Sequence, residues 1–524
     1  MPQLPGRRKA FRYTIYILLI IAIYLFFKTE IPILIVPPPN RKTINSKILQ
    51  IDESNENFKV NAIENDFNEK QNEKQNSDNN EQILESQDNN IENTEDQDQA
   101  NLNLEHPIYP DIYTQSTLII RQTITQINFQ NKIYNQKIHD QAIQKLKSKN
   151  PDIKIKPTIL LIQVHKRVDF LSILLDSLKN VVGIESTLII ISSDVYDEGI
   201  NNLIKEKMTF AAFQHIFYPY SRFFFPDTFP GTDVNDCPRD ISYNEAIKSG
   251  CINALHPDHY KHYREAKYVQ LKHHWYWKLQ YTFKKILPLD DYSTHVILLE
   301  DDYYVTRDML TTFNDLDDIL NSKPPSKNYD ANILSLGNYD KVTNTVASTW
   351  KIRQNLFDAV PFYGSQHNMG LCLNRKTFQA IDKCSKEFCT FDDYNWDWSI
   401  NSLVGKDTKT NKPNCLGDFR TLVLASPRVL HLGACTGAGG THLTKKGLKE
   451  CDIDAIRKTT EKFSSDIYKS IDDKIRDGDV RDLSLRKDIR TVRKKVKPNG
   501  GFNDPRDHKL CLDYNVNGPN GNEN

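Results

Sequence analysis

The hydrophobic positions of this 524-residue chain divide it into unlike parts. Residues 13–36 contain a fifteen-residue run without a charge, YTIYILLIIAIYLFF, and then a second apolar stretch. Residues 37–106 are rich in Asn, Glu, Gln and Asp and show no apolar periodicity, so they cannot bury enough surface to offset the entropy of ordering. We therefore expect a tail (1–12), a membrane anchor (13–36), a disordered acidic stem (37–106) and a folded domain (107–524).

The apolar run is suited to a single membrane span. Fifteen residues reach only ~22 Å, but Lys28 and Glu30 can snorkel, and the extended stretch can then cross a core of ~30 Å. A cleaved signal peptide is the alternative, yet no small-residue cleavage site follows the run. Basic residues precede it, which predicts a cytosolic N-terminus and a lumenal remainder. These are Arg7, Arg8, Lys9 and Arg12.

From residue 157 the pattern is that of strands and helices in alternation. Thr158–Val164 (TILLIQV) is a continuous apolar run typical of a strand buried on both faces. Asp169 is expected to cap a following helix with one apolar stripe, and residues 187–192 form the next strand. This βαβ unit predicts an α/β fold with a parallel sheet and ligands at the carboxyl ends of its strands. Further strands are expected at 295–299, 333–336, 370–373 and 429–432, and a helix packing at the domain edge within 116–149.

Acidic and basic residues collect where these strands end. Glu300, Asp301 and Asp302 directly follow residues 295–299, and like charges so close favour a hard divalent cation, although an exposed acidic turn is the alternative. The first strand leads into Gln163–Arg167 and the second into Asp194, which suits a nucleotide diphosphate with a ribose. Pairing of Arg167 with Asp169 is the other interpretation. His431 lies at the end of the apolar strand expected at 429–432 and is a candidate metal ligand. Imidazole favours Mn²⁺ over Mg²⁺.

Two aromatic clusters are candidates for a sugar site. KHHWYWK (272–278) predicts either a helix with buried rings or a stacking platform for a sugar. FDDYNWDW (391–398) interleaves carboxylates with rings, as is common at carbohydrate sites, and offers a general base.

Composition narrows the function classes. Lys+Arg and Asp+Glu are both 68, which removes the basic excess of a nucleic-acid-binding protein. Between residues 52 and 105 sixteen acidic residues face three lysines, so this stretch carries −13 and the rest of the chain +13. A mean hydropathy of −0.58 excludes several membrane spans. All nine cysteines follow the anchor, which predicts disulfides with at least one cysteine left over.

A series of motifs in one order resembles the N-acetylglucosaminyltransferase II family over about residues 156–451. The motifs are QVHKR, ISSD, CPRD, GCIN, HYREAK, KHHWYWK, LLEDDYYV, HNMGL, CTFDDYNWDW and RVLHLGAC. The resemblance implies a Golgi type II glycosyltransferase of GT-A fold, with a Rossmann-like, mostly parallel sheet. It would move GlcNAc from UDP-GlcNAc in β1,2 linkage to the α1,6-arm mannose of an N-glycan, with inversion.

The resemblance also implies roles for individual residues. Asp397 would be the general base, and Asp302 and His431 would bind Mn²⁺. The UDP side would be formed by Gln163, Val164, His165, Lys166, Arg167, Asp194, Gln270, Leu271, Lys272, His273 and His274. The acceptor side would be formed by Arg239, Asp258, Glu300, Asn368, Tyr394 and Trp396. Disulfides would join Cys237 with Cys251, Cys384 with Cys415, Cys389 with Cys511 and Cys435 with Cys451, leaving Cys372 free.

The chain departs from the family pattern at three points. It has EDDY (300–303) where the family has EEDH, HKR (165–167) where HNR is usual, and a longer spacing between Cys435 and Cys451. Two other functions stay open: a related β1,2-GlcNAc transferase for the α1,3-arm mannose or O-mannosyl glycans, and a catalytically inactive lectin-like module.

Overall fold

A computed structural model describes most of the chain from residue 156 to residue 516. The described parts are 123–128, 156–287 without 157, 294–321, 331–338, 344–432 without 408, and 497–516, with single positions or short pieces in 140–148, 454–465 and 483–485. All lie in one compact unit, Asp96–Asn524. The predicted anchor, the stem and the pair Cys435 and Cys451 lie outside the described residues. No helix in the described part is both long and apolar enough to cross a membrane.

The centre of the fold is a nine-stranded mixed sheet in the order β11-β7-β9-β6-β8-β4-β1-β2-β3. Strands β4, β1, β2 and β3 run parallel, whereas β8 is antiparallel to both of its neighbours. The bounds are β1 Thr158–Val164, β2 Leu188–Ser193, β3 Ala212–Phe217, β4 His295–Glu300, β6 Ile333–Ser335, β7 Leu356–Pro361, β8 Leu371–Asn374, β9 Arg420–Leu424 and β11 Ser484–Leu485. A separate antiparallel pair joins β5 Tyr303–Val305 to β10 Val429–His431.

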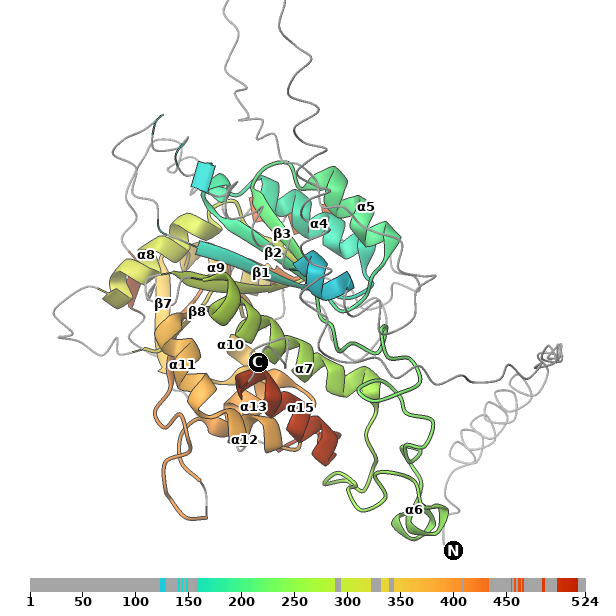
Figure 1. The fold of residues 1–524 in the computed structure, drawn as a ribbon. Helices are drawn as coiled ribbons and strands as arrows, with labels where there is room; N and C mark the ends of the chain where they lie inside the picture. The colour runs from blue at the N-terminus through green and yellow to red at the C-terminus, as the bar shows by residue number, and fades with distance from the viewer. Residues whose placement is uncertain are drawn as a thin grey trace, which may run out of the picture. The chain divides into compact units, whose positions relative to one another are not determined.

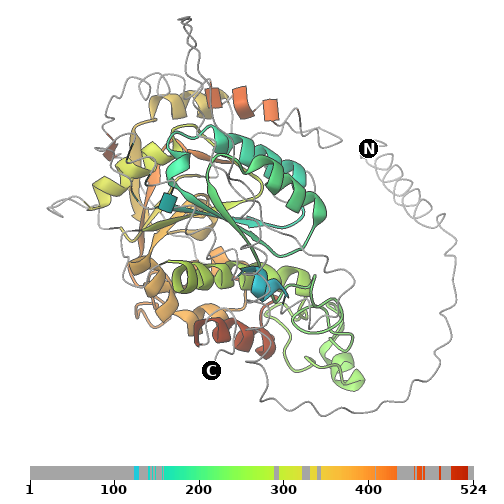
Figure 2. The same ribbon diagram turned by 45° about the horizontal axis from the view of Figure 1, so that its top comes forward.

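Helices cover both faces of the sheet (Figures 1 and 2). Alternate residues of β1 enter two different cores: Leu160 and Ile162 pack towards α4, α5 and α8, and Ile159 and Leu161 towards α7. On the first side lie α4 Val168–Lys179, α5 Glu198–Lys207 and α8 Met309–Asn321. On the α7 (Ala266–Tyr281) side lie α11 Arg375–Lys383, α12 Ser385–Thr390, α13 Trp396–Leu403 and α15 Pro505–Val516. The remaining helices are α6 Tyr243–Ser249, α9 Asn344–Ile352, α10 Gly364–His367, the 3₁₀ turn Ile184–Ser186 and the π-turn Thr282–Ile286.

Most of the sequence expectations about strands are confirmed, with shifts of one or two residues at their ends. One expectation is wrong: Asp169 does not cap α4, because the helix begins at Val168 and Arg167 holds the cap position. Asp169 lies instead in the first turn, where its negative charge interacts favourably with the positive end of the helix dipole. Residues 123–128 are helical, and Ile124 and Ile127 pack near Phe217 of the edge strand β3, as expected.

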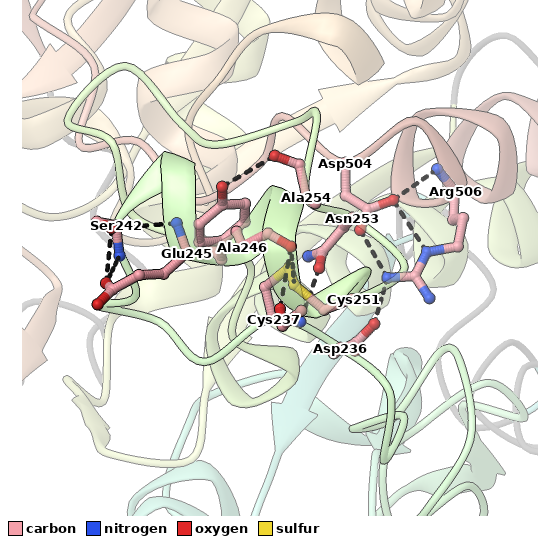
Figure 3. Close-up of a disulfide and its surroundings, with 12 residues drawn as sticks. Asp236, Cys237, Ser242, Glu245, Ala246, Cys251, Asn253, Ala254, Asp504 and Arg506 are labelled. Carbon is pink, nitrogen blue, oxygen red and sulfur yellow. Dashed lines mark hydrogen bonds and ion pairs between the residues drawn. A yellow bond between two sulfur atoms is a disulfide. The ribbon is translucent and has the colours of Figure 1, made fainter.

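Among the described residues, three disulfides hold the peripheral segments. Cys237 is joined to Cys251, Cys384 to Cys415 and Cys389 to Cys511, as the family resemblance implied, and Cys372 is free and buried. The first bond closes the insert, defined here as residues 231–264, which carries α6 (Figure 3). The third ties α12 to α15 near the C-terminus.

Candidate active site

The carboxyl ends of β1, β2 and β4 meet at one edge of the sheet. Gln163 is in register with Glu300 of β4 and with Ser192 of β2, so the chain leaves all three strands at the same level. A pocket of about 230 Å³ opens there. Its lining residues are Gln163, Val164, His165, Arg167, Asp194, Leu271, Glu300, Asp301, Asn368, Asn395, Trp396 and Asp397.

One side of the pocket is built around Asp194. Its two oxygens bond to His165 Nδ1 at 2.7 Å and Gln270 Nε2 at 2.7 Å. Gln270 is in turn held by the backbone N–H of Arg222, 2.9 Å from its Oε1. Asp194 therefore fixes the imidazole of His165, whose side chain stays half exposed at the pocket.

Arg167 neutralises part of the acidic cluster. Its guanidinium donates to Asp301 Oδ1 at 2.6 Å and to Asp302 Oδ2 at 2.7 Å. The sequence left open a pairing of Arg167 with Asp169. The structure instead shows Arg167 bridging two carboxylates, those of Asp301 and Asp302, which lie 134 and 135 residues later in the chain. Burial disfavours the charge on Arg167, but the coulombic attraction of the two carboxylates outweighs it and raises the pKa of the guanidinium.

Buried carboxylates give this edge unusual proton affinities. Burial, together with the charge of Asp302, raises the pKa of Glu300 to about 7, and burial raises the pKa of Asp301 to about 6. Asp302 behaves differently. Burial opposes its ionisation, but the hydrogen bond and charge of His431, with the charge of Arg167, outweigh that effect and lower its pKa.

Asp302 and His431 form the candidate metal pair. His431 Nε2 lies 2.9 Å from Asp302 Oδ2. Asp302 Oδ1 is buried and has no hydrogen-bond partner among the residues that the structure describes. A carboxylate with a spare oxygen beside an imidazole fits a divalent cation such as Mn²⁺. Within the described ranges no group of three or more His, Cys, Asp or Glu side chains could hold a metal alone, so substrate oxygens and water would complete the shell.

A buried ion pair holds the strand β10, which carries His431. Arg428, the residue directly before β10, is fully buried, and its Nε donates to Asp308 Oδ2 at 2.8 Å. The β5–β10 register then places His431 opposite Tyr303, one residue after Asp302.

Asp397 lies on the opposite side, in the first turn of α13. Asn368 Nδ2 donates to its Oδ2 at 3.0 Å, and the backbone N–H of Trp398 to its Oδ1 at 2.9 Å. Burial raises the pKa of Asp397 to about 6, despite these hydrogen bonds. Trp396 stacks on Trp275 with ring centroids 4.4 Å apart and is also one of the residues that line the pocket.

A model of the family described as N-acetylglucosaminyltransferase II (MGAT2) matches residues 121–511. The chain belongs to the N-acetylglucosaminyltransferase II family. It is 34% identical to an alpha-1,6-mannosyl-glycoprotein 2-beta-N-acetylglucosaminyltransferase from Sus scrofa, over 76% of this chain and 80% of the relative. The enzyme of that name from Homo sapiens is 32% identical, with the same coverage of both chains. The enzyme of that name from Arabidopsis thaliana is 26% identical, over 70% of this chain and 76% of the relative.

A comparison with solved structures adds nothing to this assignment. TarS from S. aureus, solved in complex with UDP-GlcNAc, shares 8% identity over 55% of this chain and 60% of that chain. Its TM-score of 0.27 is too low to indicate a common fold.

Family membership makes the protein a glycosyltransferase, and half of the residues expected at its site line one pocket. On the donor side these are Gln163, Val164, His165, Arg167, Asp194 and Leu271, and on the acceptor side Glu300, Asn368, Trp396 and Asp397. Asp302 and His431 are not among the lining residues, but Asp302 is bonded to Arg167, which is, and to His431.

Several other expected residues do not line the pocket. Lys166 is exposed beside it, and Gln270 lies behind Asp194. Three consecutive residues of α7, Lys272, His273 and His274, are buried and bonded to protein groups. On the acceptor side, Arg239, Asp258 and Tyr394 also stand outside the pocket lining.

The platform interpretation of the 272–278 cluster is wrong. Trp275 and Trp277 are both buried in the core, so the helix uses its rings for packing. One pocket residue, Asn395, had no expected role, and Asp301 was expected only as a member of the acidic cluster Glu300–Asp302. Both adjoin residues with expected roles of their own, and this proximity is the signal in the sequence that could have identified them.

Proposed function

We propose that the protein is a Mn²⁺-dependent inverting transferase of GT-A fold. It would move GlcNAc from UDP-GlcNAc to O2 of the α1,6-arm mannose of an N-glycan. The observation that carries this proposal is the pocket itself, which the half-buried Asp397 lines together with His165, Arg167 and the acidic residues at the end of β4. Family membership supports the choice of sugar and acceptor.

Inversion needs one base and no covalent intermediate. In the proposed reaction mannose O2 attacks the anomeric carbon of GlcNAc, the bond to UDP breaks, and the proton of O2 passes to Asp397. A carboxylate with a pKa of about 6 is mostly ionised at neutral pH and accepts a proton more readily than an ordinary aspartate. Asn368 orients the carboxylate through its hydrogen bond to Oδ2.

The diphosphate side is proposed to be formed by the basic loop after β1. His165 and Arg167 bring positive charge to the pocket, and Asp194 and Gln270 orient His165. Asp302 and His431 would hold Mn²⁺, whose chemistry is to neutralise the charge that develops on the departing UDP. His274 would support this side from inside α7, through its hydrogen bond to Ser192 of β2.

The acceptor is proposed to enter past Trp396, a largely buried residue that lines the pocket and would contribute apolar surface there. Glu300 and Asn368 lie in the same pocket. The insert, which carries Arg239 and Asp258, contacts the loop before α13, where the backbone N–H of His259 donates to Asp392 Oδ2 at 2.7 Å. For the cell, we propose a single-pass type II protein of the Golgi membrane, with residues 13–36 as anchor. Three disulfides in the described domain support an oxidising lumenal compartment.

The proposal is tested with the purified full-length chain in detergent, UDP-GlcNAc and MnCl₂. The acceptor is a hybrid N-glycan that carries GlcNAc on the α1,3 arm and a free α1,6-arm mannose. We expect one added GlcNAc, with a β1,2 linkage to the α1,6-arm mannose by NMR, and no transfer when EDTA removes the metal. Transfer only to the α1,3 arm, or only to an O-mannosyl glycan, would replace the acceptor assignment. Binding of glycans without transfer would make the protein lectin-like.

A further inference from the structure

A loop near the C-terminus is bound by three aspartates from elsewhere in the chain. We call residues 497–504 the C-terminal loop and residues 391–395, which precede α13, the base loop. Aspartate side chains accept backbone N–H groups of the C-terminal loop. The pairs are Asp393 with Asn499 at 2.7 Å, Asp258 with Gly501 at 2.9 Å and Asp392 with Phe502 at 2.9 Å. Because Asp258 belongs to the insert and the other two to the base loop, the C-terminal loop joins these segments.

Asp393 is the centre of this arrangement. It is fully buried, and its Oδ1 accepts the N–H of Asn395 at 2.8 Å while Oδ2 accepts that of Asn499. Asn395 is the cap residue of α13, and Asp397 is the second residue of that helix. Hydrogen bonds to an ionised carboxylate are stronger than neutral ones, so Asp393 fixes the backbone from which the proposed base projects.

Lys272 holds the same loop from the interior. Its buried Nζ donates to the carbonyl oxygens of Phe391 at 2.9 Å and Asp393 at 3.2 Å. It also lies 3.9 Å from the ring centroid of Phe502 in the C-terminal loop. Burial lowers the pKa of Lys272 to about 7, and the amine can donate to these carbonyls in either protonation state.

The turn in the C-terminal loop requires glycine. Gly500 and Gly501 both have φ of +82°, a region that other residues rarely adopt. A Cβ on Gly500 would lie 2.4 Å from Asp258 Oδ2, inside van der Waals contact. The loop is fixed further along the chain as well, where Arg506 pairs with Asp504 and with Asp236 of the insert (Figure 3).

We propose that Asp393 is a positioning residue for Asp397, and that Lys272 and the C-terminal loop complete the support which fixes the base loop. The proposal rests on the proposed function, because it takes Asp397 as the base. Asp393 lines no part of the pocket and acts through Asn395 and the start of α13. The same support binds Asp258, so the insert on the acceptor side and the base are held in one frame. Asp258 is therefore assigned to this frame, since both of its oxygens accept backbone N–H groups.

The test compares Asp393→Asn and Gly500→Ala with the wild type in the full-length chain. Asp393→Asn keeps the shape of the side chain but replaces one acceptor oxygen with a donor. We expect kcat to fall at least about tenfold in both variants, because small displacements of a catalytic group are costly, while calorimetric UDP affinity in MnCl₂ stays within about twofold. Gly183→Ala is the matched control: Gly183 has the same φ of +82° but open space around its Cβ, and kcat should not change.

A second readout separates positioning from general stability. The charge of Asp393 contributes to the raised pKa of Asp397, after burial. Asp393→Asn should therefore move the acid limb of kcat/KM to lower pH, whereas Gly500→Ala, which keeps the charge, should leave the limb in place. A kcat within about twofold of wild type in Gly500→Ala overturns the proposal, even if Asp393→Asn fails to fold. An unmoved acid limb in a folded Asp393→Asn protein also overturns it.

Asp397→Asn is assayed in parallel, so that two failures can be told apart. Wild-type turnover in Asp397→Asn would refute the base assignment and with it the proposed function. Loss of turnover in that variant, with wild-type turnover in both support variants, would refute the positioning role alone.

Discussion

Asn368 Nδ2 lies 3.0 Å from Asp397 Oδ2 and joins the end of α10 to the start of α13. The amide donates to a carboxylate whose pKa is raised by burial, and this hydrogen bond favours the ionised form. Asn368 Oδ1 is itself buried and has no hydrogen-bond partner among the described residues. The pair therefore offers the Asp397 carboxylate as a base and Asn368 Oδ1 as a further hydrogen-bond acceptor, in the pocket that Trp396 also lines.

Removing the proposed base should abolish transfer without affecting the donor. In Asp397→Asn the amide cannot accept the proton of mannose O2, and we expect kcat to fall by roughly 10²–10⁴. Steady-state transfer assays measure the loss, and calorimetry with UDP and MnCl₂ provides the control. Near wild-type turnover in this variant would show that another group is the base.

The pH dependence should report the raised pKa of Asp397. The base must be ionised, so kcat/KM is expected to decrease as the pH falls through about 6. The hydrogen bond from Asn368 favours the ionised form, and its removal in Asn368→Leu should move the acid limb to higher pH.

Other titratable groups share this pocket, and the variant distinguishes them. His165, Arg167, Asp194, Glu300 and Asp301 all line it, and burial raises the pKa of Glu300 to about 7. None of these is bonded to Asn368 in the described structure. A limb that stays in place in Asn368→Leu would belong to one of them, and the assignment to Asp397 would then be wrong.

The metal pair predicts a specific coupling between Mn²⁺ and UDP. Asp302→Asn removes a charged ligand, and we expect calorimetric UDP affinity in MnCl₂ to weaken by at least about tenfold. Affinity in EDTA should be unchanged. Asp169→Asn is the matched control, since Asp169 is exposed in the first turn of α4 and lies outside the site. Equal affinities for wild type and Asp302→Asn in MnCl₂ would contradict the metal assignment.

The central strands could be predicted because each is marked by a run of apolar residues within the strand itself. Thr158–Val164 is buried on both faces, and such a strand is apolar along most of its length, so its bounds are the ones that the sequence predicts. The carboxyl ends of parallel strands share one edge, which is why Gln163–Arg167, Asp194 and Glu300–Asp302 could be grouped before the fold was known.

The contacts of individual polar residues could not be predicted in the same way. Arg167 has Asp169 two positions away in sequence, yet the fold brings it to Asp301 and Asp302. In α7 successive side chains point about 100° apart, so Lys272, His273 and His274 cannot all face one ligand. All three are internal, and the partners of Lys272 and His273 belong to the base loop and to α15, segments far away in sequence whose docking has no local signal.

A close approach between Gly364 and the backbone of Asp397 gives a last prediction. Gly364 of α10 lies so near α13 that a Cβ on it would be 2.3 Å from the carbonyl oxygen of Asp397. Since that oxygen belongs to the backbone, it cannot turn away, and Gly364→Ala must push α10 and α13 apart.

A displacement of ~1 Å at the base should lower kcat by about 10²-fold, with UDP affinity unchanged. Gly199→Ala in α5 is the control, because its Cβ would meet only side-chain atoms, at 3.2 Å or more. Transfer assays on both variants decide the matter: if Gly364→Ala folds and retains wild-type kcat, then the position of Asp397 is not critical, and the close packing of α10 on α13 serves stability alone.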